Sequence, residues 1–238
     1  MKKKYLVHVI YITIILALIV SPFIVINTKP NEMGDFEQYY HDKCISYTME
    51  NMNASEGQIV FVGDSLTDGY KLDEHYADLD SIVYNRGIGG DTTQGVLGRI
   101  DVSILDINPS KVVLLIGAND INAGQEVDSV VKNYSEIVSK IKNKLPETKL
   151  YCVSLLPQND DIEMYGDFDA KKHVDAIMKV NEKIKEIVEE NENTIYIDLF
   201  SLLKDENNML IKEYSPDGLH LNEKGYDIWT SAVKEHLR

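Results

Sequence analysis

The segment "IVFVGDSLTDG", residues 59–69, joins a short apolar run to a turn rich in aspartate and glycine. Consecutive apolar residues bounded by turn residues are typical of a strand that is buried on both faces. The turn places Ser65 between Asp64 and Leu66, directly after this run. The segment therefore predicts a strand, a tight turn and a helix, with a serine at the turn.

Apolar runs of the same kind recur along the chain, at residues 58–62, 81–84, 111–116, 149–155 and 194–198. Helical patterns lie between them, and two show a clear apolar face, over 127–141 and 174–188. Continuous apolar strands separated by amphipathic helices indicate a parallel sheet covered on both faces. The chain of 238 residues therefore predicts one α/β domain of three layers, over residues 58–238.

The first 30 residues differ in character from the rest. Three lysines at positions 2–4 precede an almost uncharged run over residues 5–26, which as a helix would span roughly 33 Å. That length crosses a bilayer, and no small-residue cleavage site follows it. We expect residues 1–30 to form an uncleaved transmembrane helix; the alternative is a cleaved signal peptide and a secreted protein.

The lysines before this run favour a cytoplasmic N-terminus. The expected location is therefore the cell membrane, in a single pass, with the remaining chain extracellular. Residues 31–57 begin with a polar connector and continue with Phe36, Tyr40, Cys44 and Tyr47 at helical spacing. This pattern predicts a stem helix that packs on the domain.

The charge of the chain restricts its partners. The formal net charge is −15, and the residues after 30 carry 39 acidic against 20 basic side chains. Such a surface repels polyanions and argues against nucleic-acid binding. Cys44 and Cys152 do not make a disulfide framework or a zinc spacing, so neither metal nor cofactor is expected. The oligomeric state stays open.

The serine at position 65 needs a general base to act as a nucleophile. Of the six histidines, His220 alone follows an aspartate, Asp217, by three residues on a turn that contains Gly218. This spacing lets the carboxylate reach one ring nitrogen while the other faces a substrate. The remaining histidines lie in the apolar run, the stem, segments expected to be exposed, and the C-terminus: His8, His41, His75, His173 and His236.

Hydrolysis of an ester also needs donors for the oxyanion. Three candidates lie at the predicted carboxyl ends of strands, where ligands bind in parallel sheets: the backbone N–H of Ser65, the backbone N–H of Gly90, and the side-chain amide of Asn119. Gly89 adjoins Gly90 and is the alternative glycine.

Each of these residues also has a purely structural interpretation. The glycines could serve backbone turns, Asp91 could cap a helix with Gln94 three residues on, and Asn222 could cap the last helix. Turn chemistry alone does not account for a nucleophile, two donors and a base at four separate strand ends. Together they favour a catalytic site.

These motifs resemble the SGNH hydrolase superfamily, also called GDSL esterases and lipases. Residues 86–100, "RGIGGDTTQGVLGRI", are most similar to the branch of the platelet-activating-factor acetylhydrolase catalytic subunits. The resemblance covers residues 58–238 and implies a flavodoxin-like sheet of five parallel strands. It also implies the roles of the site residues. Ser65 is the nucleophile, Gly90 and Asn119 are oxyanion donors, and Asp217 with His220 forms the family's last sequence motif.

The predicted function is a metal-independent serine esterase. We expect a small ester substrate, such as acetyl on a cell-envelope carbohydrate or a short-chain lipid ester. The alternatives are an acyltransferase with the same nucleophile, a binding module without turnover, and a metal phosphoesterase that uses Asp64, Asp68 and Asp120. The last lacks clustered metal ligands, so Asp68 and Asp120 are expected to stabilise their own turns.

Overall fold

The computed structural model describes residues 34–161 and 170–238. The chain divides after Tyr39 into two units. Gly34–Tyr39 contribute the start of helix α2 (Asp35–Asn51) to the first unit, and Tyr40–Arg238 form the second. No helix in the described ranges is long and apolar enough to cross a membrane. The predicted transmembrane helix at 1–30 lies outside those ranges and stays a prediction.

Five parallel strands form one sheet in the order β2-β1-β3-β4-β5. This confirms the predicted three-layer α/β fold, and the order is that of flavodoxin-like sheets. The strands are β1 (Ile59–Gly63), β2 (Val83–Gly87), β3 (Lys111–Leu115), β4 (Lys149–Val153) and β5 (Thr194–Ile197).

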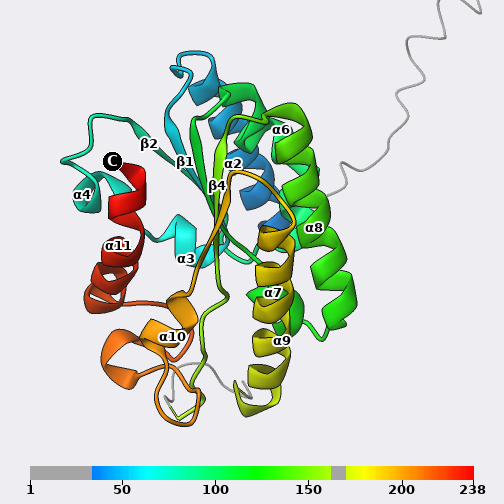
Figure 1. Ribbon diagram of the computed structural model, residues 1–238, viewed down its shortest axis with the longest axis vertical. Coiled ribbons are helices and arrows are strands. Elements are labelled where there is room, and N and C mark those ends of the chain that lie inside the picture. Colours follow the sequence, from blue (N-terminus) through cyan, green and yellow to red (C-terminus); the bar gives the residue numbers. More distant parts are fainter. Residues whose placement is uncertain (1–33, 162–169) are drawn as a thin grey trace, which may run out of the picture. The chain divides into compact units, whose positions relative to one another are not determined.

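Helices cover the sheet on both faces (Figure 1). One face carries α4 (Leu72–His75), α10 (Leu199–Leu203) and α11 (Glu223–Leu237), and the other carries α6 (Ile100–Ser103), α8 (Val127–Lys144) and α9 (Ala170–Glu189). The shorter elements are α3 (Ser65–Asp68), α5 (Thr93–Gly98), α7 (Ala118–Asn122) and two 3-10 turns, η2 (Leu105–Ile107) and η3 (Lys212–Tyr214).

The strand residues alternate between two apolar cores, which explains the continuous apolar runs of the sequence. Val60 and Val62 of β1 pack toward α8 and α9, whereas Ile59 and Phe61 pack toward α11, where Trp229 is fully buried. A strand that is covered by helices on both sides has no polar face. Reactive polar side chains must therefore come from the segments that follow the strands.

Strand β2 differs from its predicted range, because it extends to Gly87 instead of ending at Tyr84. The additional residues include Asn85 and Arg86, whose polarity ends the apolar run in the sequence. Arg86 is nevertheless buried, and its guanidinium donates to the carboxylate of Glu50 and the side-chain carbonyl of Asn51. Side chains from α2 therefore bind the two terminal nitrogens of a side chain that an isolated strand would not bury.

Candidate active site

Ser65 is the first residue of α3, at the carboxyl end of β1. The turn before it is tight, because a Cβ on Gly63 would lie 2.3 Å from the carbonyl oxygen of Leu115. The side chain of Asp64 caps α3 by accepting from the backbone N–H of Leu66 at 3.0 Å. Cap and glycine together hold the Ser65 side chain at the edge of the sheet.

The structure brings Ser65 and His220 together across 155 positions of the chain. The Ser65 Oγ lies 3.0 Å from His220 Nε2. The other ring nitrogen, Nδ1, lies 2.6 Å from Asp217 Oδ2. A hydroxyl, an imidazole and a carboxylate in this series form the arrangement in which a serine can lose its proton to a base.

The loop that carries Asp217 and His220 is fixed by its own hydrogen bonds. Asp217 Oδ1 accepts from the backbone N–H of His220 at 2.7 Å and of Leu219 at 2.9 Å. The Ser215 hydroxyl donates to the carbonyl oxygen of His220 at 2.6 Å. Gly218 takes a left-handed φ of +82° and lies against the backbone of Asn159.

These contacts set the charge of Asp217. Burial raises the pKa of its carboxyl group, but hydrogen bonds from the His220 ring and from two backbone N–H groups outweigh that effect. The pKa therefore lies below its ordinary value, and the carboxylate stays ionised beside the imidazole.

Of the predicted oxyanion donors other than Ser65, Gly90 lies on the loop after β2 and Asn119 lies on the short helix α7. The backbone N–H of Ile88 donates to the carbonyl oxygen of Gly63 at 3.1 Å, and Gly90 follows with a left-handed φ of +77°. The Asn119 side-chain amide donates to the carbonyl oxygen of Asp91 at 2.8 Å. Asn119 is thus joined to the residue that follows Gly90, and Ile88, two residues before Gly90, is joined to the turn before Ser65.

Arg99 joins the segments of Gly63 and Asp91, a role that was not predicted from the sequence. It is buried, and its Nε donates to Asp91 Oδ2 at 2.8 Å while Nη2 donates to the carbonyl oxygen of Gly63 at 3.0 Å. The one available signal was the pairing of Asp91 with Arg99 at the two ends of a glycine-rich segment. Arg99 holds the Gly90 loop against the turn that presents Ser65.

Two capping alternatives have different outcomes. Asn222 does cap α11, since its side chain accepts from the backbone N–H of Gly225 at 3.2 Å. Asp91 does not cap α5, because Thr92 occupies that position and Asp91 is paired with Arg99. The Asp91 carboxylate accepts from Arg99 Nε through Oδ2 and from the backbone N–H of Thr92 through Oδ1.

The expectation that Asp68 and Asp120 stabilise their own turns was wrong. Asp120 accepts from the backbone N–H of Thr93 at 3.0 Å and from its hydroxyl at 2.6 Å. Asp68 pairs with Lys43 of α2 at 2.5 Å. Both aspartates therefore bridge segments that are distant in sequence.

His75 was expected to be exposed, but only 8% of its side chain is accessible to solvent. Its Nδ1 lies 2.9 Å from the hydroxyl of Thr230 in α11. This contact fills a gap between α4 and α11, far along the chain from the Asp217 loop, and His75 has a structural role.

Asp64 carries an unusual charge environment for a surface turn. It is 2% exposed, and burial raises the pKa of its carboxyl group to about 7. This value is the net result, because the nearby Asp91 carboxylate also raises the pKa, whereas the bond from Leu66 and the charge of His220 lower it. Protonation of Asp64 therefore falls within the range in which an esterase is assayed.

Cysteine and metal chemistry have little support among the described residues. Neither Cys44 nor Cys152 forms a disulfide, and burial raises the pKa of Cys152 to about 12, which disfavours a thiolate. Within residues 34–161 and 170–238, no group of three or more His, Cys, Asp or Glu side chains could hold a metal ion.

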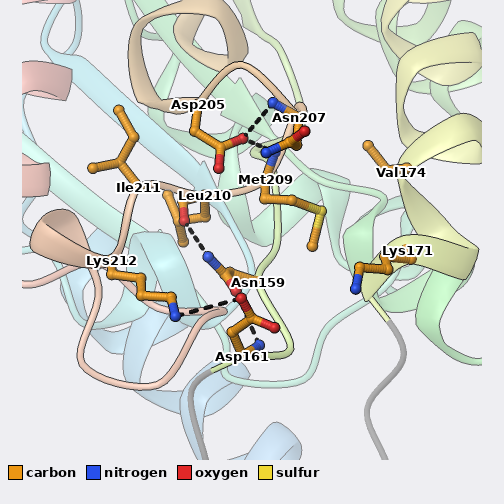
Figure 2. Close-up of a pocket in the computed structure, with 10 residues that line it drawn as sticks. All are labelled: Asn159, Asp161, Lys171, Val174, Asp205, Asn207, Met209, Leu210, Ile211 and Lys212. Atoms are coloured by element: carbon orange, nitrogen blue, oxygen red, sulfur yellow. Dashed lines mark hydrogen bonds and ion pairs between the residues drawn. The ribbon is translucent and has the colours of Figure 1, made fainter.

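A cavity of about 710 Å³ lies between the start of α9 and the segments around Asn159 and Lys212 (Figure 2), and Ser65, Asp217 and His220 are not among its lining residues. Its wall includes Asn159, whose backbone N–H donates to the carbonyl oxygen of Gly218 at 2.8 Å. Figure 2 shows Lys171 of α9 and Lys212 on different sides of the cavity, with Asp161 bonded between Asn159 and Lys212. The lining combines six polar or charged residues with four apolar ones, Val174, Met209, Leu210 and Ile211.

Known proteins resemble this chain in sequence and in fold. Residues 61–228 match the model of the GDSL-like lipase/acylhydrolase family. The alpha1 subunit of platelet-activating factor acetylhydrolase IB from Bos taurus is 30% identical over 136 residues, which are 56% of this chain and 53% of the relative. The alpha2 subunit from Rattus norvegicus is 32% identical over 129 residues, 53% of this chain and 55% of the relative. The chain matches about half the length of these curated relatives.

Solved structures share the fold over most of the chain. A structure from Streptococcus pneumonia, named for a platelet activating factor, aligns with a TM-score of 0.77 at 28% identity, covering 84% of this chain and 94% of that one. An acetylxylan esterase from Geobacillus stearothermophilus aligns with a TM-score of 0.59 at 17% identity, covering 77% and 95%. The latter likeness shows the fold alone.

The fold is that of an α/β protein with five parallel strands and a serine at the end of its first strand. The chain belongs to the GDSL-like lipase/acylhydrolase family.

Proposed function

We propose that this protein is a serine esterase in which Ser65 is the nucleophile, His220 the general base and Asp217 the group that orients His220. The observation that carries the proposal is the pair of contacts at His220, 3.0 Å to Ser65 Oγ and 2.6 Å to Asp217 Oδ2. Because Asp217 bonds Nδ1, it stabilises the tautomer whose Nε2 can accept a proton.

The reaction proceeds in two halves. His220 Nε2 takes the proton of Ser65 as Oγ forms a bond to the ester carbonyl carbon, and the carbonyl π electrons move to oxygen. The intermediate collapses, the alcohol leaves with the proton from His220, and the acyl group stays on Ser65. Water then adds by the same base-assisted route and releases the acid. Asp217 remains ionised throughout, which stabilises the imidazolium.

The oxyanion is held by the backbone N–H groups of Ser65 and Gly90 and by the side-chain amide of Asn119. The bonds among Gly63, Ile88, Asp91 and Asn119 support this assignment. An amide nitrogen carries two hydrogens, so the bond to Asp91 fixes the Asn119 side chain and leaves a second donor for substrate. Donors fixed in advance need no reorganisation when charge develops.

The substrate class that we favour is a small acyl ester, such as acetyl on a cell-envelope carbohydrate, with a short-chain lipid ester as the second candidate. The cavity lined by Asn159, whose backbone N–H bonds Gly218, carries six polar or charged side chains that can bind the hydroxyl groups of a carbohydrate. One structural neighbour acts on acetylxylan, and the curated relatives are acetylhydrolases. A membrane location with the catalytic domain outside the cell is part of this proposal and rests on residues 1–30.

The proposal is tested by treating the detergent-solubilised protein with a fluorophosphonate probe and with 4-nitrophenyl acetate, each with and without a chelator. We expect labelling and acetate release, both lost in Ser65→Ala and kept in Ser139→Ala, a serine on the exposed face of α8. Activity that survives in Ser65→Ala, or that disappears on chelation, would contradict a serine mechanism.

A further inference from the structure

Helix α2 lies outside the part of the chain that matches the family, residues 61–228. From Tyr40 onward its side chains nevertheless contact the segments that carry Ser65 and Gly90. Three of these contacts have defined geometry, and each is made by a different residue of the helix, at positions 40, 43 and 47. The spacing places all three on one helix face.

The first contact reaches the helix of the nucleophile. Lys43 Nζ lies 2.5 Å from Asp68 Oδ1. Asp68 is the last residue of α3, the helix of four residues that begins with Ser65. The two side chains are 29% and 24% exposed, so water screens this ion pair less than a pair on an open surface.

The second contact reaches the strand before the oxyanion loop. The Tyr47 hydroxyl donates to the carbonyl oxygen of Gly87 at 2.5 Å. The Tyr47 ring is 3% exposed and lies under the Arg86 guanidinium, whose carbon is 4.6 Å from the ring centroid. Gly87 is the last residue of β2, three positions before Gly90.

Asp68 and Gly87, the residues held by Lys43 and Tyr47, also touch each other. A Cβ on Gly87 would lie 2.1 Å from the backbone nitrogen of Asp68. Helix α2 is therefore bonded to both residues of this backbone contact between α3 and β2. Loss of either bond, from Lys43 or from Tyr47, would let α3 and β2 move apart.

The third contact lies beyond the oxyanion loop. The Tyr40 hydroxyl donates to the carbonyl oxygen of Gly95 in α5 at 2.8 Å. Burial raises the pKa of Tyr40 to about 12, so the hydroxyl keeps its proton and remains a donor. Helix α2 thus contacts the chain on both sides of Gly90, at Gly87 and at Gly95.

We infer that α2 is a brace of the active site, in which Lys43, Tyr47 and Tyr40 are positioning residues that fix the separation of Ser65 from the Gly90 donor. The inference rests on the proposed serine mechanism. Misplacement of a nucleophile relative to its oxyanion donors weakens transition-state binding more than substrate binding. The brace should therefore act on kcat and leave KM nearly unchanged.

The test compares the full-length chain in detergent with Lys43→Met and Tyr47→Phe, using 4-nitrophenyl acetate. Each variant is expected to lower kcat about tenfold, with KM within about twofold of the original, and to slow fluorophosphonate labelling in parallel. Matched controls make the same replacements away from the site: Lys183→Met removes the exposed ion pair with Glu186, and Tyr151→Phe removes a hydroxyl bonded to the His236 carbonyl. Both controls should keep the original kcat.

Thermal unfolding separates positioning from folding, with rates measured at least about 15 °C below each midpoint. Lys43→Arg, which can keep the ion pair, should recover most of the kcat lost in Lys43→Met. If the original protein is active and Lys43→Met and Tyr47→Phe keep its kcat, the brace is overturned and the serine mechanism stands. The same holds if the variants raise KM and leave kcat unchanged. An original protein that neither hydrolyses the ester nor reacts with the probe would overturn the proposed mechanism and the brace together.

Discussion

Gly218 lies against the carbonyl oxygen of Asn159, where a Cβ would come within 1.8 Å of that oxygen. The same glycine has a φ of +82° and lies between Asp217 and His220 in the sequence. The wall of the cavity and the loop of Asp217 and His220 are thereby packed backbone to backbone.

Gly218→Ala should damage both stability and catalysis. The new methyl group must displace Asn159 or the Asp217 loop, in addition to the cost of a left-handed alanine, on the order of 1 kcal/mol. We expect a lower melting temperature and a lower kcat with 4-nitrophenyl acetate. Gly57→Ala is the matched control, because Gly57 has a φ of +76° and nothing within 4 Å of its would-be Cβ. Equal effects in the two variants would contradict the packing argument.

Asp217→Asn should leave the fold intact and reduce kcat by roughly 10³- to 10⁴-fold. An amide at this position favours the imidazole tautomer with its proton on Nε2, which cannot accept the proton of Ser65. Circular dichroism would check the fold and ester hydrolysis the rate. Asp73→Asn, on the exposed side of α4, serves as the control. Retention of a tenth or more of the original rate would show that Asp217 does not orient the base.

Asn119→Ala should cost roughly 3 to 4 kcal/mol of transition-state stabilisation, which is about 10²- to 10³-fold in kcat, with KM little changed. The amide that the bond to Asp91 holds in place would be removed from the oxyanion site. Steady-state kinetics with a short-chain ester measure the split. A rise in KM without a fall in kcat would instead place Asn119 in ground-state binding.

Asp64→Asn tests the raised pKa of that carboxyl group. In the folded protein the pKa is about 7, against an ordinary value of 3.8, so the unfolded chain releases its proton first as pH rises. Stability should therefore fall between these values, with a slope of at most about 1.4 kcal/mol per pH unit, and then level off. Asparagine keeps the helix cap without the charge.

The measurement for Asp64 is chemical denaturation of the original protein and of Asp64→Asn between pH 4 and pH 8. The variant should gain stability relative to the original as pH rises to about 7, and the difference should be constant above that. A difference that does not change with pH would mean that Asp64 is ionised throughout.

Local pattern was sufficient for most of the fold and for part of the site. Apolar runs with amphipathic helices between them predicted the parallel sheet, because buried strands have no polar face. Asp217 and His220 could be paired because they lie three residues apart on one turn. Both inferences needed only neighbours in sequence.

The sequence pattern could not predict contacts between residues that are distant in sequence. Arg86 is buried in β2 because Glu50 and Asn51 approach it from α2, and nothing near position 86 reveals that. Arg99 bonds Gly63 across 36 positions, and Asp68 pairs with Lys43 across 25. Such contacts depend on tertiary packing, whereas periodicity reports only which face of an element is buried.

The bonds of α2 bear on where the chain can be shortened to obtain a soluble enzyme. A fragment that starts at Phe61, where the family match begins, would lack Tyr40, Lys43 and Tyr47 and would leave the Arg86 guanidinium without its carboxylate. A fragment that starts at Gly34 retains the whole helix and omits the apolar run over residues 5–26. The second starting point is the better choice for purification and crystallisation.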